Sequence, residues 1–137
     1  MRALLDVNVL IALLDAAHVH HQRASQWLEQ ELHHGWASCP LTQNGCLRLM
    51  AQPAYPQAFP LAAVAQRLAL AAATAAHVFI ADDYSLLDTG SLQWPHLLGH
   101  RQVTDAYLLG LAVRHGCRFA SFDARVNLAA VPGAKAQ

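Results

Sequence analysis

Short apolar segments that alternate with helix-like segments constrain the fold of this chain more than any other feature. Strand-like segments are expected at residues 3–5, 36–39, 77–81 and 118–122. Segments with helical composition or spacing lie between them, at residues 9–14, 19–34, 40–50, 61–76 and 105–115. Such alternation predicts an α/β fold with a mainly parallel central sheet flanked by helices.

Several residues indicate where these helices begin and end. Thr42 and Thr104 have the side-chain type that caps helix N-termini, and we expect them to cap the third and the last helix. Gly35 and Gly116 are expected to end the helices before them, because glycine readily adopts the left-handed conformation that follows a helix. The polar stretch 82–98 has no clear assignment.

The composition indicates one globular domain over residues 1–137. Hydrophobic residues make up 55% of the chain and charged residues 13%, which excludes a disordered protein. Nine Lys and Arg residues balance nine Asp and Glu residues, which argues against a protein that binds nucleic acid by a strongly basic surface alone.

The cysteines and the apolar segments predict a soluble protein of the cytoplasm with no membrane association. The three cysteines form no C-x-x-C pair, so neither a disulfide framework nor a cysteine zinc site is indicated. The longest apolar region, residues 61–81, is interrupted by Gln66, Arg67 and His77, which favours a buried amphipathic helix over a membrane span.

Three aspartates stand where functional groups gather in folds of this class. Asp6 and Asp123 each follow a strand-like segment directly, and Asp105 lies at the start of the last helix. In an open parallel sheet, ligands bind beyond the carboxyl ends of the strands, so these carboxylates can meet at one edge. Their mutual repulsion would raise their pKa values. A hard divalent cation such as Mg²⁺, or Mn²⁺ as an alternative, would relieve it.

Such a site would suit phosphoryl chemistry, although each aspartate also has a structural explanation. A bound cation can hold a phosphate oxygen and lower the pKa of its water ligand. Asp105 would also be favourable in a first helical turn without any catalytic role, and Asp123 would also suit an ordinary turn or a cap. Asp6 is harder to explain in that way, because a carboxylate within an apolar segment is costly unless it is paired or metal-bound.

Four segments resemble PIN-domain ribonucleases, and most closely the VapC toxins of bacterial VapBC toxin–antitoxin modules. They are LDVNVL at 5–10, CPLTQNG at 39–45, RQVTDAYL at 101–108 and SFD at 121–123. The resemblance covers nearly the whole chain, in order. It implies a PIN-like fold and a Mg²⁺-dependent endoribonuclease that cleaves structured RNA, commonly tRNA, and is restrained by a VapB antitoxin.

By position, the resemblance also implies roles for individual residues. Asp6 and Asp105 match the principal metal ligands, and Asp123 matches a further carboxylate after the last strand. Asn8 and Ser121 match positions that orient ligands or water.

The chain departs from the family at one position. Many PIN domains have a T-x-x-E pattern on the helix after the second strand, whereas Thr42 here is followed by Gln43, Asn44 and Gly45. The Asn44 amide would still be able to bind Mg²⁺ or hold its water shell, but it adds no negative charge. We therefore expect weaker metal affinity than in a site with four carboxylates.

Two arginines and one apolar helix are the candidate contacts to partners. Arg48 and Arg101 are expected to border the cleft, where their planar guanidinium groups would suit phosphate, although ordinary ion pairing would explain them equally well. Residues 61–76 are expected to form core or a dimer interface, since the high apolar content of so short a chain favours a homodimer and an antitoxin-covered surface.

Other classes of protein fit the sequence less well. A haloacid-dehalogenase phosphatase needs a second aspartate where this chain has Asn8, and both it and a receiver domain need a lysine, which does not occur before Lys135. The remaining alternative is a PIN-like module without catalysis that binds RNA or a protein, because the middle glutamate is absent.

Two further groups of polar residues are expected to be structural. Glu31 and His34 form an E-x-x-H pair, which is only half of a metal site, so surface side chains are the simpler reading. Asp82, Asp83 and Asp88 are expected to belong to a solvated loop.

Overall fold

A four-stranded parallel sheet lies at the centre of the computed structural model, which describes residues 1–88, 92–96 and 99–123. The strand order is β3-β2-β1-β4, and every neighbouring pair is parallel. The strands are β1 (Ala3–Leu5), β2 (Trp36–Ser38), β3 (His77–Phe79) and β4 (Arg118–Ala120). The predicted mainly parallel sheet is confirmed.

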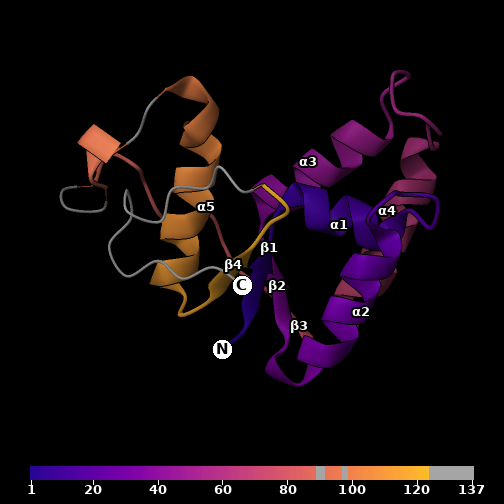
Figure 1. Cartoon of the computed structure of the whole chain (residues 1–137), viewed down its shortest axis with the longest axis horizontal. Helices are drawn as coiled ribbons and strands as arrows, with labels where there is room; N and C mark the ends of the chain where they lie inside the picture. The colour runs from indigo at the N-terminus through magenta and orange to yellow at the C-terminus, as the bar shows by residue number, and fades with distance from the viewer. Residues whose placement is uncertain (89–91, 97–98, 124–137) are drawn as a thin grey trace.

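Helices cover both faces of this sheet (Figure 1). One face packs against α5, and the other is covered by the helices of the first half of the chain. The helices are α1 (Val7–Leu14), α2 (His21–Glu31), α3 (Pro40–Met50), α4 (Leu61–Ala72) and α5 (Val103–Arg114), with short 3₁₀ turns η1 (Leu32–His34), η2 (Trp94–His96) and η3 (His100–Gln102). The protein is therefore an α/β/α sandwich in which the strands form the middle layer.

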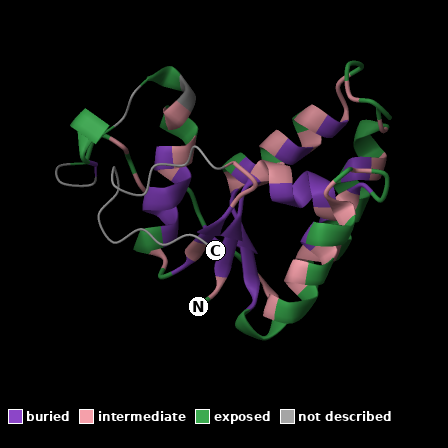
Figure 2. Ribbon diagram, viewed as in Figure 1, coloured by how far each residue is buried: buried purple, intermediate pink, exposed green. Residues whose placement is uncertain are grey.

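The alternation of side chains along the strands produces two hydrophobic cores, because successive residues of a strand point to opposite faces. Leu4 and Phe119 lie in the core against α5. Leu5, Trp36 and Ala120 lie in the core on the other face. Figure 2 shows that the strands in the middle of the sheet are largely buried, and β3, at its edge, is partly exposed.

The two predicted threonine caps are wrong. Cys39 is the N-cap of α3, and Pro40 begins the helix. Thr42 lies within the first turn, where its Oγ1 accepts a hydrogen bond from the Cys39 N–H at 3.0 Å and donates to the Cys39 carbonyl at 3.1 Å. Thr104 also lies inside its helix, whose N-cap is Gln102.

The predicted helix ends at Gly35 and Gly116 are confirmed. Their φ values are +76° and +67°, in the left-handed region that glycine favours. Several elements differ in length from the prediction. The helix expected at 9–14 begins at Val7, the one expected at 19–34 begins at His21 and becomes η1 after Glu31, and the one expected at 61–76 ends at Ala72. The last three strands end earlier than expected, at Ser38, Phe79 and Ala120.

None of the helices that the structure describes is long and apolar enough to cross a membrane.

The acidic residues after β3 lie in an exposed loop, as expected, and Asp82 and Asp83 also make specific contacts there. The Asp82 carboxylate accepts a hydrogen bond from the Leu41 N–H at 3.2 Å, at the amino end of α3. Asp83 pairs with Arg114 at 3.0 Å and with His115 at 2.9 Å. The segment after β3 therefore connects α3 with α5.

Gly110 provides the space that this segment needs to approach α5. A Cβ atom at Gly110 would collide with the hydroxyl and the ring of Tyr84. The Tyr84 hydroxyl is buried and has no hydrogen-bond partner among the described residues. The absence of a side chain at position 110 thus permits close packing of the Tyr84 ring.

We predict that Gly110→Ala lowers the free energy of unfolding by about 1–3 kcal/mol through overpacking, despite the higher helix propensity of alanine. Tyr84→Phe should be neutral or stabilising, because it removes a buried hydroxyl without a partner. In the Tyr84→Phe background, Gly110→Ala should lower the free energy of unfolding by less than it does in the wild type. Urea unfolding of the wild type, both single variants and the double variant checks this, and a stabilised Gly110→Ala protein would contradict it.

Candidate functional site

The Asp6 carboxylate lies where β1 ends and α1 begins. Its backbone N–H still belongs to the sheet and donates to the Ala120 carbonyl at 2.9 Å. Its side chain already caps the helix, because Oδ1 accepts a hydrogen bond from the Val7 N–H at 2.7 Å. Asp6 is only 8% exposed. The direct change from strand to helix therefore holds a nearly buried carboxylate at the carboxyl edge of the sheet.

The Ser121 hydroxyl links this carboxylate to the end of β4. Ser121 Oγ donates to Asp6 Oδ2 at 2.6 Å. The same oxygen accepts from Asn8 Nδ2 at 3.3 Å and from the Asp123 N–H at 3.0 Å. One donated and two accepted bonds use the full capacity of a hydroxyl, so the orientation of Ser121 is determined.

Asn8 completes the connection between the first helix and the last strand. Its Oδ1 accepts a hydrogen bond from the Phe122 N–H at 3.2 Å, while its Nδ2 donates to Ser121. The Phe122 ring stacks on His20, with ring centroids 4.8 Å apart. The structure thus brings together Asp6, Asn8 and Ser121, which the sequence placed in one site.

The electrostatic surroundings of Asp6 favour a neutral group or a bound cation. Burial raises the pKa of Asp6 above its ordinary value of 3.8. The hydrogen bonds from Ser121 and Val7 lower that pKa, and the nearby negative charge of Asp123 raises it. Asp123 is half-buried and close enough to act on Asp6. A cation between these two carboxylates would offset both the cost of burying the Asp6 charge and its repulsion from Asp123.

Asp105 lies at the same edge of the sheet because of the direction in which α5 runs. Because α5 leads through a short turn into β4, it runs opposite to the strands, and its first turn lies at their carboxyl end (Figure 1). Asp105 is half-buried and heads the helical row that continues with Leu108, Leu109 and Ala112, all of which are buried. It therefore lies on the side of α5 that faces the sheet.

The structure does not contain a ready-made site of three metal ligands. Within residues 1–88, 92–96 and 99–123, no three His, Cys, Asp or Glu side chains lie close enough to hold one metal ion. The joint binding of a metal by Asp6, Asp105 and Asp123 therefore stays a prediction. The negative charge of Asp123 contributes to the raised pKa of Asp6, which brings these two carboxylates into one electrostatic environment.

Asn44 does not lie with this group. It is exposed and lines a hollow between α3 and α4 together with Leu47, Leu68 and Ala69. The next residue, Gly45, faces α1, and a Cβ atom there would lie 2.8 Å from a methyl carbon of Val7. A helix turns by about 100° per residue, so adjacent positions face different neighbours. Gly45, at the position of the family's glutamate, is thus the residue beside the first turn of α1.

The two predicted RNA-binding arginines are described to different extents. Arg48 is exposed and lies on the same helical row as Gly45, which places it on the side of α3 that faces α1. Arg101 belongs to η3, and its side chain lies outside the described residues.

A hollow of about 480 Å³ opens beside Asp6, and its walls include residues that the sequence did not single out. They are Asp6, Val7, Asn8, Ile11, His18, Leu49, Gln52, Ala54, Tyr55 and Pro56. Residues 52–56 and His18 lie outside the helices and strands that the sequence predicts. No local pattern marks either as part of a site.

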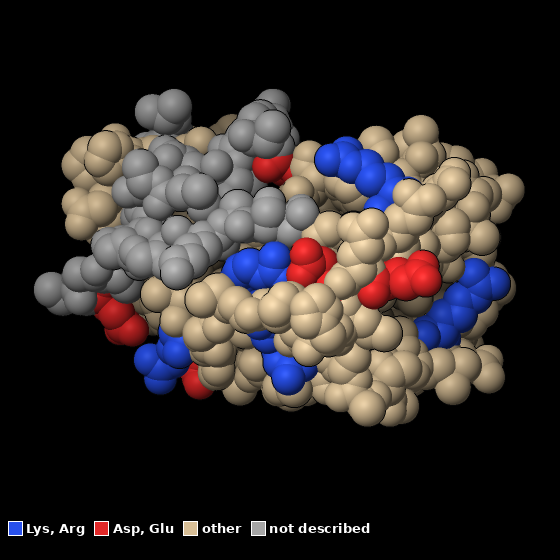
Figure 3. Space-filling view, turned by 60° about the horizontal axis from the view of Figure 1, so that its bottom comes forward, with Lys and Arg blue, Asp and Glu red and all other residues tan. Residues whose placement is uncertain are grey.

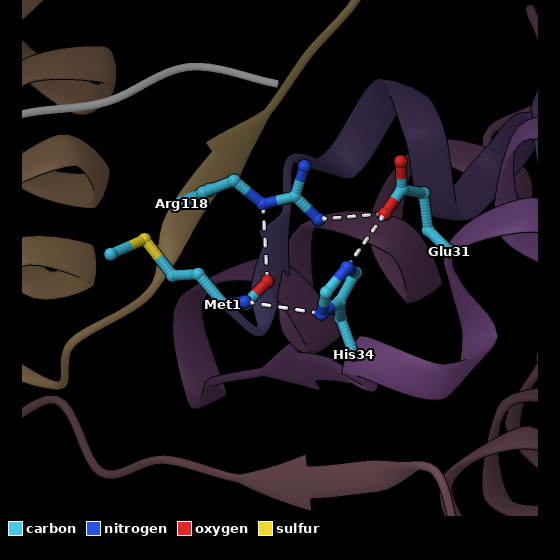
Figure 4. Close-up of polar contacts among 4 residues, drawn as sticks. All are labelled: Met1, Glu31, His34 and Arg118. Atoms are coloured by element: carbon cyan, nitrogen blue, oxygen red, sulfur yellow. Dashed lines mark hydrogen bonds and ion pairs between the residues drawn. The ribbon is translucent and has the colours of Figure 1, made fainter.

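The E-x-x-H pair lies at the opposite, amino end of the sheet and is part of a structural network (Figure 4). Glu31 Oε2 accepts a hydrogen bond from Arg118 Nη2 at 3.3 Å and lies 3.8 Å from His34 Nε2. The Met1 amino group contacts His34 Nδ1 at 3.2 Å, and Arg118 Nε donates to the Met1 carbonyl at 3.1 Å.

On the face of the molecule drawn in Figure 3, acidic and basic side chains are interspersed.

The α/β/α sandwich with carboxylates at the strand ends defines the class of protein, and comparison with known families agrees. A sequence model described as "PIN domain" matches residues 3–133. The chain therefore belongs to the PIN-domain family. A solved structure of VapBC2 from Rickettsia felis, bound to a DNA fragment from their promoter, superposes with a TM-score of 0.68 at 11% identity, over 100% of this chain and 98% of that chain. This likeness shows the fold alone.

Curated relatives place the chain within the VapC branch of the family. It is 50% identical to Ribonuclease VapC44 of Mycobacterium tuberculosis over 137 residues, which is 100% of this chain and 96% of the relative. It is 45% identical to Ribonuclease VapC38 of the same organism over 125 residues, covering 90% of this chain and 86% of the relative. The predicted resemblance to PIN-domain VapC toxins is confirmed.

We predict that Asp6→Asn raises the melting temperature at pH 7 by a few degrees without added metal. The pKa of Asp6 is raised in the folded state, so the unfolded chain loses this proton first as the pH rises. The free energy of unfolding therefore falls as the pH increases from about 3.8 through the folded-state pKa, and the charged form is destabilising above it. Asparagine removes that charge.

Thermal unfolding between pH 3 and pH 8 measures this effect. The advantage of Asp6→Asn should disappear at the acidic end, where Asp6 of the wild type is protonated. Glu29→Gln, which removes an exposed carboxylate, serves as the matched control and should leave the melting temperature nearly unchanged. An Asp6→Asn protein that is less stable than the wild type at pH 7 would refute the interpretation.

Proposed function

We propose that this chain is the toxin of a VapBC-type module and acts as a Mg²⁺-dependent endoribonuclease, with Mn²⁺ as an alternative ion. The observation that carries this proposal is the nearly buried Asp6 carboxylate, whose pKa is raised by burial and by Asp123 at the carboxyl edge of the sheet. The name ribonuclease, which the curated VapC relatives bear, supports it.

The residues at this edge fit a hard divalent cation. Mg²⁺ prefers carboxylate oxygens and keeps several of its waters, so it does not require a complete set of protein ligands. Asp6, Asp105 and Asp123 would hold it. When bound, the ion supplies a water of lowered pKa and neutralises charge on the phosphate.

The surrounding residues act by orienting these carboxylates. Ser121 keeps Asp6 Oδ2 in place, and Asn8 keeps Ser121 and the Phe122 backbone in place. We propose that water attacks the phosphorus directly and that one bond between phosphorus and a ribose oxygen breaks, releasing that oxygen as a hydroxyl, so that the 2′-hydroxyl of the RNA is not the nucleophile. The products would then contain no 2′,3′-cyclic phosphate.

We propose structured RNA, with tRNA as the first candidate, as the substrate of this site. Arg48 and Arg101 would bind its phosphates, since guanidinium groups form paired hydrogen bonds to phosphate. The expected protein partners in the cytoplasm are a VapB-type antitoxin and a second copy of the chain. The structural neighbour, a VapBC assembly, supports a partner of the antitoxin kind.

A PIN-like module without catalysis is the second candidate, and one observation favours it. Gly45 stands at the position of the family's glutamate, and the Val7 side chain occupies the space beside it. Such a module would bind RNA or a protein without cleaving it.

Incubation of the purified protein with total tRNA, in Mg²⁺, in Mn²⁺ or in a chelator, separates the two candidates. We predict cleavage only with metal. Asp6→Asn should reduce the rate at least about 100-fold, and Ser121→Ala should reduce it about 10–100-fold, as is typical of groups that orient metal ligands. Glu29→Gln, which lies away from the site, should cleave normally.

The other outcomes of this experiment are informative. Binding of tRNA without metal-dependent cleavage would favour the non-catalytic module. Cleavage that survives Asp6→Asn would mean that this carboxylate does not hold the ion. A 2′,3′-cyclic phosphate at the new RNA end would contradict direct attack by water.

A further inference from the structure

The hollow beside Asp6 has the size and the position of a binding site for one nucleoside. Its volume of about 480 Å³ lies in the range of small-ligand pockets. Asp6 and Asn8 belong to its lining, so the hollow adjoins the proposed reaction site. The hollow is otherwise formed by α1, by His18 in the segment between α1 and α2, by the end of α3 and by the segment that follows α3.

The wall formed by Tyr55 is held in a defined orientation by contacts distant in the sequence. The Tyr55 hydroxyl donates to Asp15 Oδ2 at 2.5 Å, and the other oxygen of Asp15 accepts from the Ala17 N–H at 3.0 Å. The Tyr55 N–H donates to the Gln52 carbonyl at 3.0 Å, which closes a turn after α3. Asp15 is 5% exposed, so this anchor is nearly buried. The wall is therefore preorganised.

The side chains around the hollow match the chemistry of an unpaired nucleobase. Proteins recognise single-stranded RNA by stacking bases on aromatic rings and by hydrogen bonds to the base edges. Tyr55 and His18 offer aromatic rings, and Ile11 and Leu49 offer apolar walls. The amide of Gln52 offers both donors and an acceptor.

His18 adds a defined donor to this set. Its Nδ1 accepts a hydrogen bond from the His20 N–H at 3.0 Å. In the neutral imidazole the proton must then lie on Nε2, which makes that nitrogen a hydrogen-bond donor. A base edge with an acceptor would suit this position.

We infer that the hollow lined by His18, Gln52 and Tyr55 is a base-binding subsite that receives the nucleobase next to the scissile phosphate. The inference deepens the proposed function and rests on it for the identity of the substrate. Arg48 lies exposed near the end of α3, four residues before Gln52, and we assign it to the phosphate of the same nucleotide. The subsite would make the enzyme selective for the base at one position beside the cut.

Nucleotide binding tests the subsite without any need for catalysis. Each of the four ribonucleoside 5′-monophosphates is added to the ¹⁵N-labelled full chain without divalent metal, and the side-chain amide signals are followed by NMR. We expect one or two of the nucleotides to shift the Gln52 amide signals and to leave those of Gln57, which is exposed and outside the hollow, in place.

Variants then assign the binding to the hollow. Gln52→Leu keeps the side-chain bulk but removes the amide. It should weaken binding of the preferred nucleotide about tenfold, as expected for the loss of one or two hydrogen bonds. Tyr55→Phe keeps the ring but removes its anchor to Asp15, and should weaken binding as well. Gln57→Leu is the matched control and should bind like the wild type. The inference is overturned if no nucleotide at millimolar concentration moves the Gln52 signals, or if Gln52→Leu binds all four like the wild type.

Mapping of RNA ends gives an independent readout that separates the two proposals. If the wild type cleaves RNA with a preference for one base beside the cut, Gln52→Leu should weaken that preference, and Gln57→Leu should retain it. An unchanged preference in Gln52→Leu would overturn the subsite while the proposed nuclease stands. Nucleotide binding at Gln52 without any cleavage would support the subsite and refute the nuclease.

Discussion

The site depends on the position of one carboxylate, that of Asp6, which is held at the junction between the central strand β1 and the helix α1. Burial makes its negative charge unfavourable, and the hydrogen bonds from Val7 and Ser121 compensate only in part, since the pKa of Asp6 remains raised. A buried charge that lowers the stability of the protein without its ligand is typical of functional sites, where the charge is retained because it binds a ligand or an ion. A bound cation would supply the stabilisation of the Asp6 charge that these hydrogen bonds do not provide.

The rest of the fold brings distant segments to that carboxylate. The parallel order places the ends of β1 and β4 side by side, so that Ser121 and Asn8 can link them by direct hydrogen bonds. The direction of α5 places its first turn, which contains Asp105, at the same edge. Close packing of Gly45 on Val7 brings α3 against the first turn of α1. The site is therefore built from four parts of the chain, each held by contacts that a single substitution can test.

The strands and the position of Asp6 could be predicted from the sequence, because both depend on local patterns. Short apolar segments bounded by turn-forming residues identified all four strands that the structure describes. The caps could not be predicted in the same way. A threonine hydroxyl satisfies backbone groups either as the cap or, as Thr42 does, from inside the first turn, and the two positions differ by only three residues. The spacing of the T-x-x-E pattern from Thr42 leads to Gly45, whereas the contact of Gly45 with Val7 of α1 could not be predicted from the sequence. The base-binding hollow depends on a hydrogen bond between Tyr55 and Asp15, 40 positions apart, which no local pattern announces.

The most direct test of the central claim is the pKa of the Asp6 carboxyl group, measured by NMR titration of its side-chain carbon with and without Mg²⁺. The account predicts a pKa above the ordinary 3.8 in the metal-free protein and a clear decrease when Mg²⁺ is added, because the ion stabilises the charged form. A pKa at or below 3.8 that does not respond to Mg²⁺ would show that Asp6 is neither strained by burial nor a ligand of the metal.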